Sequence, residues 1–81
     1  MTSNLPNVTL YTRKGCCLCE EAKRVLLLAR TRKPFDLEEV DIDLDLALRA
    51  EYNEEVPVVA VNGRKLFQYE VRIADFLKEL A

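Results

Sequence analysis

The sequence predicts an α/β domain in which a mixed four-stranded sheet is flanked by three helices, in the order βαβαββα. Short runs of β-branched and aromatic residues alternate with longer runs whose apolar residues recur every three or four positions. The dipeptide Asn62-Gly63 separates two of the short runs and favours a tight hairpin turn, because both residues tolerate positive φ angles. No repeat, low-complexity run or linker interrupts the 81 residues, so we expect residues 1–81 to form one domain.

The first half of the chain predicts a strand, a helix and a second strand. Val8–Thr12 is β-branched and aromatic, as strands are. The helix begins near Leu18, has acidic residues in its first turn and basic residues in its last, and is stopped by Pro34. Phe35–Ile42 is the second strand, with a break in its alternation at its two glutamates. The helix carries its apolar side on Ala22, Val25, Leu26 and Ala29.

The second half predicts a short helix, a hairpin and a closing helix. Asp43 is placed to cap the short helix. Val58–Val61 and Lys65–Phe67 are the hairpin strands. A βαβ unit followed by a helix and an antiparallel hairpin builds a mixed sheet. The apolar side of the short helix is Leu44, Ala47, Leu48 and Tyr52, and that of the closing helix is Ile73, Phe76, Leu77 and Leu80.

Composition and charge exclude several classes of function. Lys and Arg number 12 against 14 Asp and Glu, and the two signs are interspersed, which gives a net charge of -2 and no basic patch for nucleic acid. The amino terminus lacks the pattern of a secretory signal, and no apolar run approaches the ~18 residues of a membrane span. We therefore expect a soluble, cytoplasmic protein that works as a monomer, with neither nucleic acid nor a membrane as partner.

Three cysteines lie within four positions, at Cys16, Cys17 and Cys19, and the rest of the chain contains none. Small secreted domains spread an even number of cysteines along the chain to close long loops. One tight cluster in a chain without a secretory signal instead indicates redox or metal chemistry.

The spacing of the cysteines favours one disulfide. If Cys16 opens the helix, Cys16 and Cys19 lie about 60° apart around the axis and about one turn apart along it, which suits a disulfide. Cys17 and Cys19 project about 200° apart. The Cα atoms of the adjacent Cys16 and Cys17 lie only about 3.8 Å apart, below the usual disulfide range. Cys16 and Cys19 therefore form the one easy pair.

The position of Cys16 favours it as the nucleophile. Free backbone N–H groups and the positive end of the helix dipole stabilise a thiolate at a helix amino terminus. Arg13 and Lys14 add positive charge just upstream, although Glu20 and Glu21 oppose it. Cys17 is expected to pack or to tune its neighbours, and a direct, auxiliary redox role stays open.

Other uses of the cysteine cluster stay open as well. Three thiolates are ligands for zinc or an iron–sulfur cluster, but the chain has no histidine, and a fourth ligand would have to be a carboxylate, a partner or an external thiol such as glutathione. We expect no metal site. The pair is also suited to a non-catalytic module whose binding to a partner depends on its redox state.

Two segments resemble the signatures of a known family. Val8–Cys19 closely resembles the opening of glutaredoxins and of compact glutaredoxin-like proteins, and Val56–Gly63 resembles their second signature. The resemblance implies a thioredoxin fold and a thiol–disulfide oxidoreductase. It also implies that Cys16 attacks, that Cys19 resolves the mixed disulfide, and that Pro57 is a cis-proline beside the cysteines.

The resemblance also indicates how substrate is held and where this chain departs from the family. We expect Arg13, Lys14, Val56 and Pro57 to contact a protein or low-molecular-weight disulfide, with an external thiol as reductant and no required cofactor. Cys17-Leu18 replaces the Pro-Tyr or Gly-Pro of well-known motifs.

The segment after the hairpin is a second departure. Typical glutaredoxins have Gly-Gly and an acidic residue here, whereas this chain has Gln68, Tyr69 and Glu70. The bulky residues hinder the approach of backbone N–H groups to a carboxylate, so glutathione is expected to be at most a weak co-substrate. Tyr11 and Tyr69 either line a substrate groove or pack against the sheet.

Overall fold

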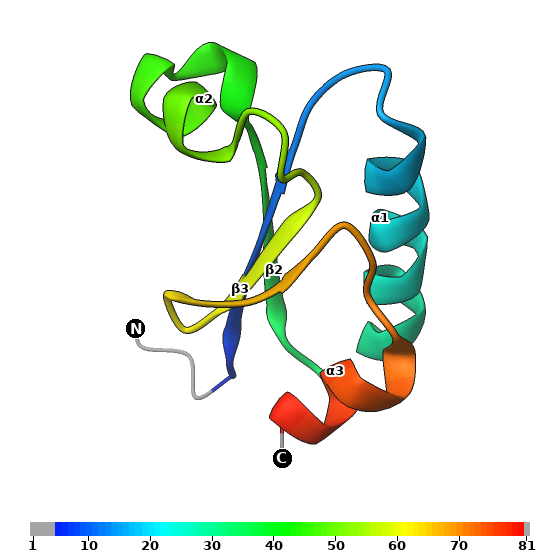
Figure 1. The fold of residues 1–81 in the computed structure, drawn as a ribbon. Helices are drawn as coiled ribbons and strands as arrows, with labels where there is room; N and C mark the ends of the chain where they lie inside the picture. The colour runs from blue at the N-terminus through cyan, green and yellow to red at the C-terminus, as the bar shows by residue number, and fades with distance from the viewer. Residues whose placement is uncertain (1–4, 81) are drawn as a thin grey trace.

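A computed structural model describes residues 5–80 (Figure 1) and has the predicted order of elements. A 3-10 turn, η1, precedes α2 and is the one addition to that order. Within the described residues, no helix is both long enough and apolar enough to cross a membrane. The elements are β1 (Asn7–Thr12), α1 (Cys17–Arg30), β2 (Asp36–Asp41), η1 (Ile42–Leu44), α2 (Leu46–Tyr52), β3 (Val58–Val61), β4 (Arg64–Gln68) and α3 (Ile73–Glu79).

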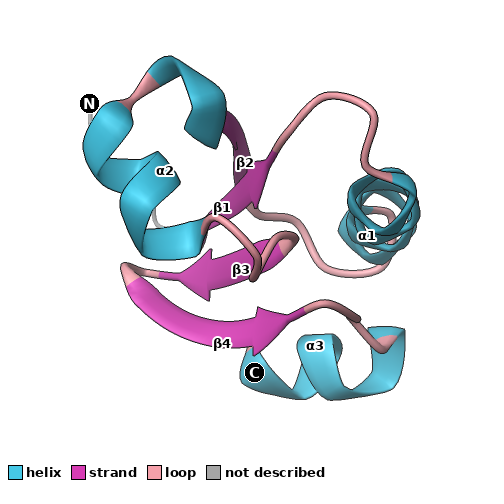
Figure 2. Ribbon diagram, turned by 45° about the horizontal axis from the view of Figure 1, so that its top comes forward, coloured by secondary structure: helices cyan, strands magenta, loops and turns pink. Residues whose placement is uncertain are grey.

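The four strands form one mixed sheet in the order β2-β1-β3-β4. β1 and β2 are parallel, whereas β3 pairs with β1 and β4 in antiparallel fashion. Figures 1 and 2 show α1 and α3 on one face of the sheet and α2 on the other. The predicted α/β class, with three helices flanking a mixed four-stranded sheet, is confirmed.

The main core lies between the sheet and the two helices on its first face. Phe76 of α3 is fully buried and meets the ring of Phe35 edge-on, with the centroids 5.3 Å apart. From α1, the core receives the buried side chains of Ala22, Leu26 and Ala29, which lie on the side of the helix that the sequence predicted to be apolar. This packing fixes α1, and with it the amino terminus of α1, relative to β1 and β3. The buried members of the core are Val8, Leu10, Ala22, Leu26, Ala29, Phe35, Val59, Val61, Val71 and Phe76.

The hairpin is confirmed with a two-residue turn. Asn62 and Gly63 have φ angles of 52° and 83°, and Val61 pairs with Arg64 across the turn. Both positive angles are those of the turn type that matches the twist of a hairpin.

The start of α2 differs from the prediction, because Asp43 does not cap the helix. The carboxylate of Asp45 accepts hydrogen bonds from the N–H groups of Ala47 and Leu48, at 2.9 and 3.2 Å. The chain first forms η1, where Asp41 accepts from the N–H of Asp43 at 2.9 Å. Alternating aspartates supply a cap to each of the two successive turns, which leaves the carboxylate of Asp43 free for another partner.

The apolar side predicted for α2 is only partly correct. Leu48 and Tyr52 pack against a smaller cluster around Cys19 and Ile42. Leu44 lies in η1 and is 85% exposed, because the extra turn rotates it out of the helical pattern.

Candidate active site

Cys16 is the N-cap of α1. Its backbone is extended, with φ -96° and ψ 110°, and its Sγ accepts a hydrogen bond from the N–H of Cys19 at 3.1 Å. Gly15, with φ 75°, provides the left-handed turn that brings the chain into this geometry. An oxygen of Ser, Thr, Asp or Asn usually accepts this N–H in a helix cap, and here a sulfur does.

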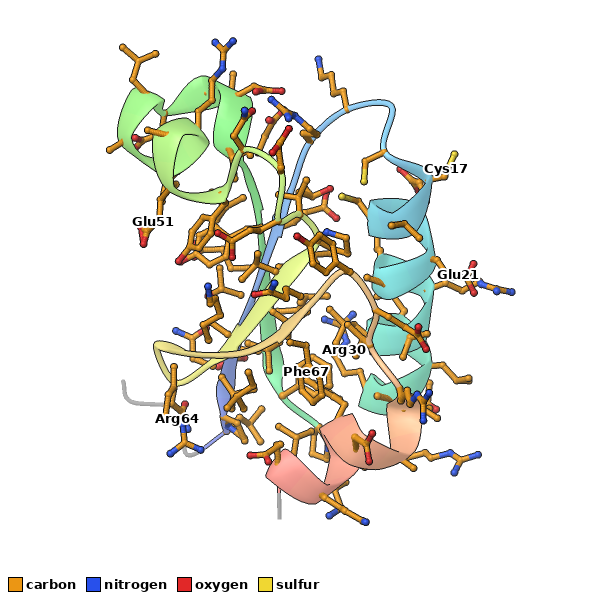
Figure 3. All side chains as sticks on the ribbon, viewed as in Figure 1. Cys17, Glu21, Arg30, Glu51, Arg64 and Phe67 are labelled. Carbon is orange, nitrogen blue, oxygen red and sulfur yellow. The ribbon has the colours of Figure 1, made fainter. Side chains whose placement is uncertain are left out.

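The three cysteines differ sharply in their surroundings. Cys16 is half-buried, Cys17 is exposed and Cys19 is 2% exposed. Figure 3 shows the side chain of Cys17 on the outer side of α1, away from the sheet. The three thiols therefore do not converge on one point, and within residues 5–80 no three cysteine or carboxylate side chains are grouped as metal ligands. The disulfide between Cys16 and Cys19 stays a prediction.

The pKa of the Cys19 thiol is raised above its usual value. Burial is the main cause, and a hydrogen bond to the side chain of Cys16 adds to it, while contacts with Thr12 and the backbone of Arg13 oppose it. Because a low-dielectric setting disfavours the charged form, Cys19 is held as a protonated thiol beside Cys16.

The Val56-Pro57 segment lies against the cysteines. The peptide bond between these residues is cis, as the family resemblance implied. Val56 is 8% exposed and packs with Cys19 and Ile42, and the side chain of Pro57 is fully buried. The N–H of Tyr69 donates to the carbonyl oxygen of Pro57 at 2.8 Å, and this bond holds the segment after β4 beside the cis-proline.

A groove of about 310 Å³ runs beside α1, between that helix and the segment after β4. Tyr69 is 46% exposed and forms part of its wall, whereas Tyr11 stacks on Tyr52 with ring centroids 4.8 Å apart. The sequence left open whether each tyrosine lines a groove or packs in the fold: Tyr69 lines a groove, and Tyr11 packs against Tyr52. The lining residues are Leu18, Glu21, Ala22, Val25, Tyr69, Glu70 and Val71.

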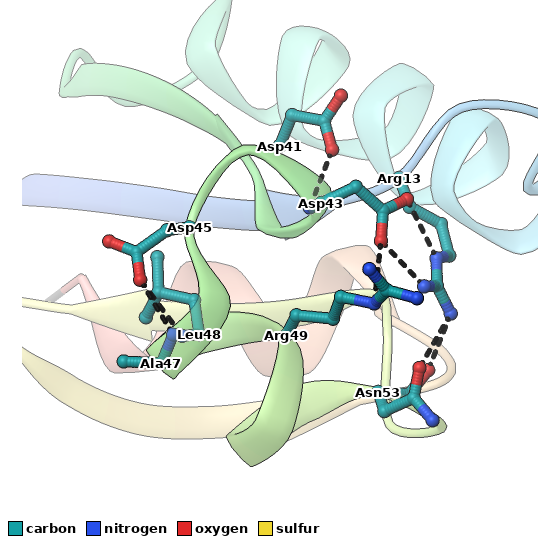
Figure 4. A network of polar contacts seen from close by, with 8 residues as sticks. All are labelled: Arg13, Asp41, Asp43, Asp45, Ala47, Leu48, Arg49 and Asn53. Carbon is teal, nitrogen blue, oxygen red and sulfur yellow. Dashed lines mark hydrogen bonds and ion pairs between the residues drawn. The ribbon is translucent and has the colours of Figure 1, made fainter.

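The two cations upstream of Cys16 have different surroundings. Arg13 is bound by Asp43 and Asn53 (Figure 4), whereas Lys14 is exposed. Asp43 and Asn53 lie 30 and 40 residues from Arg13 along the chain, and no local sequence pattern indicates contacts at such separations. Whether either cation contacts a substrate stays a prediction.

These features define a class of protein. A mixed four-stranded sheet with Cys-x-x-Cys at the amino terminus of its first helix and a cis-proline beside it is the arrangement of a thioredoxin-fold protein. The chain also matches the family described as "Glutaredoxin-like domain (DUF836)" over residues 7–81, and it belongs to this family.

Relatives and solved structures agree with this assignment. The uncharacterized protein Rv0508 of Mycobacterium tuberculosis is 34% identical over 71 residues, which cover 82% of this chain and 73% of that protein. The solution structure of Ne2328 from Nitrosomonas europaea has a TM-score of 0.84 at 28% identity and covers 100% of this chain and 98% of its own. The structure of XcR50 from X. campestris has a TM-score of 0.77 at 34% identity, with 90% and 93% covered.

More distant structures show the fold alone. Thioredoxin-2 of a malaria parasite has a TM-score of 0.74 at 17% identity, and the match covers 98% of this chain and 84% of that one. The membership of the chain in a glutaredoxin-like family with a thioredoxin fold supports a redox-related role.

Native-state alkylation of the reduced protein with iodoacetamide tests the burial of the thiols. Cys19 is expected to react last of the three, because it is buried and its pKa is raised. Labelling of Cys19 should remain slow as the pH passes about 8.5, where an ordinary thiol ionises. Mass spectrometry of proteolytic fragments over a pH series follows each site, and urea-unfolded protein is the control. Labelling of Cys19 as fast as Cys17 in the native state would contradict this description.

Proposed function

We propose that this protein is a thiol–disulfide oxidoreductase that exchanges disulfides through Cys16 and Cys19. The observation that carries the proposal is the hydrogen bond of 3.1 Å from the N–H of Cys19 to the Sγ of Cys16. An N–H at the positive end of a helix stabilises a thiolate, and a thiolate is the form that attacks disulfides. The buried thiol of Cys19 lies beside it, one turn along the helix.

The reaction consists of two exchanges. The Cys16 thiolate attacks one sulfur of the substrate disulfide, the substrate S–S bond breaks, and the other substrate sulfur leaves as a thiolate that takes up a proton. Cys19 then loses its proton and attacks the Sγ of Cys16, which releases the second substrate thiol. The substrate gains two electrons, and the protein is left with a Cys16–Cys19 disulfide. An external thiol reductant restores the dithiol.

The raised pKa of Cys19 suits the order of these steps. A protonated thiol is a poor nucleophile, so Cys16 attacks first. Once Cys16 is in the mixed disulfide, Cys19 is already in place as an intramolecular nucleophile. The exposed Cys17 takes no part in this sequence, and we assign it at most an auxiliary role.

The substrate is expected to lie along the cis-proline segment. Val56 packs with Cys19 and is joined to Pro57 by the cis peptide bond, so a protein or small disulfide at Cys16 would lie beside this segment. Lys14 is the exposed cation nearest in sequence to Cys16. No cofactor beyond the external thiol is required, and a monomer in a reducing compartment such as the cytoplasm fits the reaction.

The two cysteines should have separate effects when each is replaced. Cys16→Ser is expected to lower reduction of a peptide disulfide to the uncatalysed rate, because the attacking sulfur is gone. Cys19→Ser should still react once and accumulate the mixed disulfide. Stopped-flow turnover and intact-mass measurement check both results.

Urea unfolding of both variants controls for loss of the fold. Equal turnover by the wild type and Cys16→Ser would remove the catalytic proposal and leave a module that senses redox state or binds a partner. Bound iron or zinc after anaerobic purification would favour a metal carrier instead.

Glutathione is a poor fit to the segment after β4. The N–H of Tyr69 donates to the carbonyl of Pro57, and the N–H of Glu70 donates to that of Gln68, both at 2.8 Å. Neither N–H is left for the carboxylate of a bound tripeptide, and the exposed Glu70 repels it. Arg13 is already bound within the chain, so Lys14 is left to attract glutathione.

Glutathione is therefore expected to reduce the oxidised protein poorly. Each missing charge-assisted hydrogen bond is worth about 1.5–3 kcal/mol, so kcat/KM with glutathione should be at least about tenfold below that with a thioredoxin-type dithiol donor. The remaining activity should fall with added salt. Turnover of one mixed-disulfide substrate with each donor in turn makes the comparison. A higher kcat/KM with glutathione would identify an ordinary glutaredoxin and overturn this view of residues 68–70.

A further inference from the structure

Arg13 makes four hydrogen bonds within the chain (Figure 4). Its Nε and Nη2 donate to the two carboxylate oxygens of Asp43, at 3.2 and 2.6 Å. Its Nη1 donates to the backbone carbonyl of Asn53 at 2.8 Å and to the Oδ1 of Asn53 at 3.1 Å. A guanidinium has five N–H groups, so at most one remains for a substrate.

The partners of Arg13 belong to segments that meet at the active site. Arg13 lies three residues before Cys16, and Asn53 ends α2 four residues before Pro57. Asp43 lies in η1, directly after the Ile42 that packs with Cys19 and Val56. One side chain therefore joins the loop that carries the nucleophile to the segment that leads into the cis-proline.

We propose that Arg13 is a positioning residue that holds the Cys16 loop against the cis-proline segment, and that it does not bind the substrate. The proposal rests on the proposed function and is an alternative to the expectation that Arg13 is a substrate contact. The two hydrogen bonds between the guanidinium and the carboxylate of Asp43 fix the orientation of the two groups as well as their distance. A lysine at this position would not fix the orientation. Exchange needs the sulfur of Cys16 in line with a substrate disulfide held beside the Val56-Pro57 segment.

The charge on Arg13 supports the same assignment. The carboxylate of Asp43 pairs with it at 2.6 Å, and the nearby carboxylate of Asp41 adds to the electrostatic stabilisation of the guanidinium. Arg13 is therefore surrounded by partners on η1 and α2, whereas Lys14 beside it has no hydrogen bond or ion pair among the described residues. An anionic substrate would meet Lys14 before it met Arg13.

Replacing Asp43 separates the two roles, because they predict opposite results. If Arg13 bound substrate, Asp43→Asn would free its guanidinium, and exchange would become faster. If Arg13 positions the loops, the same variant breaks the contact, and exchange becomes slower. Arg13→Lys keeps the charge and loses the fork, so a substrate-binding role would largely survive it and a positioning role would not.

The experiment compares the full-length wild type, Arg13→Lys, Asp43→Asn and the double variant, all fully reduced. Stopped-flow mixing with a fluorogenic peptide disulfide gives the rate constant of exchange. Alkylation of Cys16 by iodoacetamide, followed by mass spectrometry, gives the reactivity of the same thiol toward a reagent that needs no cis-proline edge. Arg24→Gln removes an exposed arginine that pairs with Glu21 on α1 and is the matched control.

We expect each single variant to lower the rate of peptide exchange about tenfold, since a displacement of about 1 Å is enough for such a loss. The double variant should be no slower than either single one, because all three break the same contact. Alkylation of Cys16 should stay within about twofold of the wild type, since it depends on the thiolate rather than on the alignment. Arg24→Gln should match the wild type.

Faster exchange in Asp43→Asn, or wild-type exchange in Arg13→Lys, would overturn the assignment. A double variant in which the two single losses of exchange rate combine would also overturn the assignment. Rapid alkylation of the buried Cys19 in either variant would show that the contact serves stability alone, which also contradicts a positioning role. Absence of exchange in the wild type would instead overturn the proposed function, and this assignment with it.

Discussion

The hydrogen bond that caps α1 is the interaction on which the rest of this account depends. The sulfur of Cys16 occupies the place of the usual capping oxygen and accepts the N–H of Cys19. The same contact begins the helix and holds the candidate nucleophile at its positive end. The Sγ of Cys16 therefore serves both as the helix cap and as the candidate nucleophile.

The cap is useful only if α1 is held in place, and two hydrophobic clusters hold it. The main core fixes the helix on the sheet through Leu26 and its neighbours. The smaller cluster around Cys19, Ile42 and Val56 sets the depth of the second thiol and raises its pKa through burial. The hydrogen bond from the N–H of Tyr69 to the carbonyl of Pro57 holds the segment after β4 against the cis-proline.

Local patterns predicted most of the fold and the position of the cysteines at the start of α1. Asn62-Gly63 and the apolar side of α1 depend on residues within a few positions, so the sequence alone located the hairpin, the helix and the cysteine pair. It misplaced the cap of α2, because Asp43 and Asp45 are equally suitable by residue type and only the extra turn η1 decides between them. The partners of Arg13 were beyond reach, since they depend on how distant segments pack.

In the proposed function, Cys16 and Cys19 are one redox pair and Cys17 is not part of it. A redox titration of the full-length protein in dithiothreitol buffers, with alkylation after unfolding and mass-spectrometric mapping of each thiol, tests it most directly. We expect a single two-electron transition in which Cys16 and Cys19 become protected together while Cys17 stays alkylatable. Mapping of Cys17 into the dominant intramolecular disulfide would contradict it.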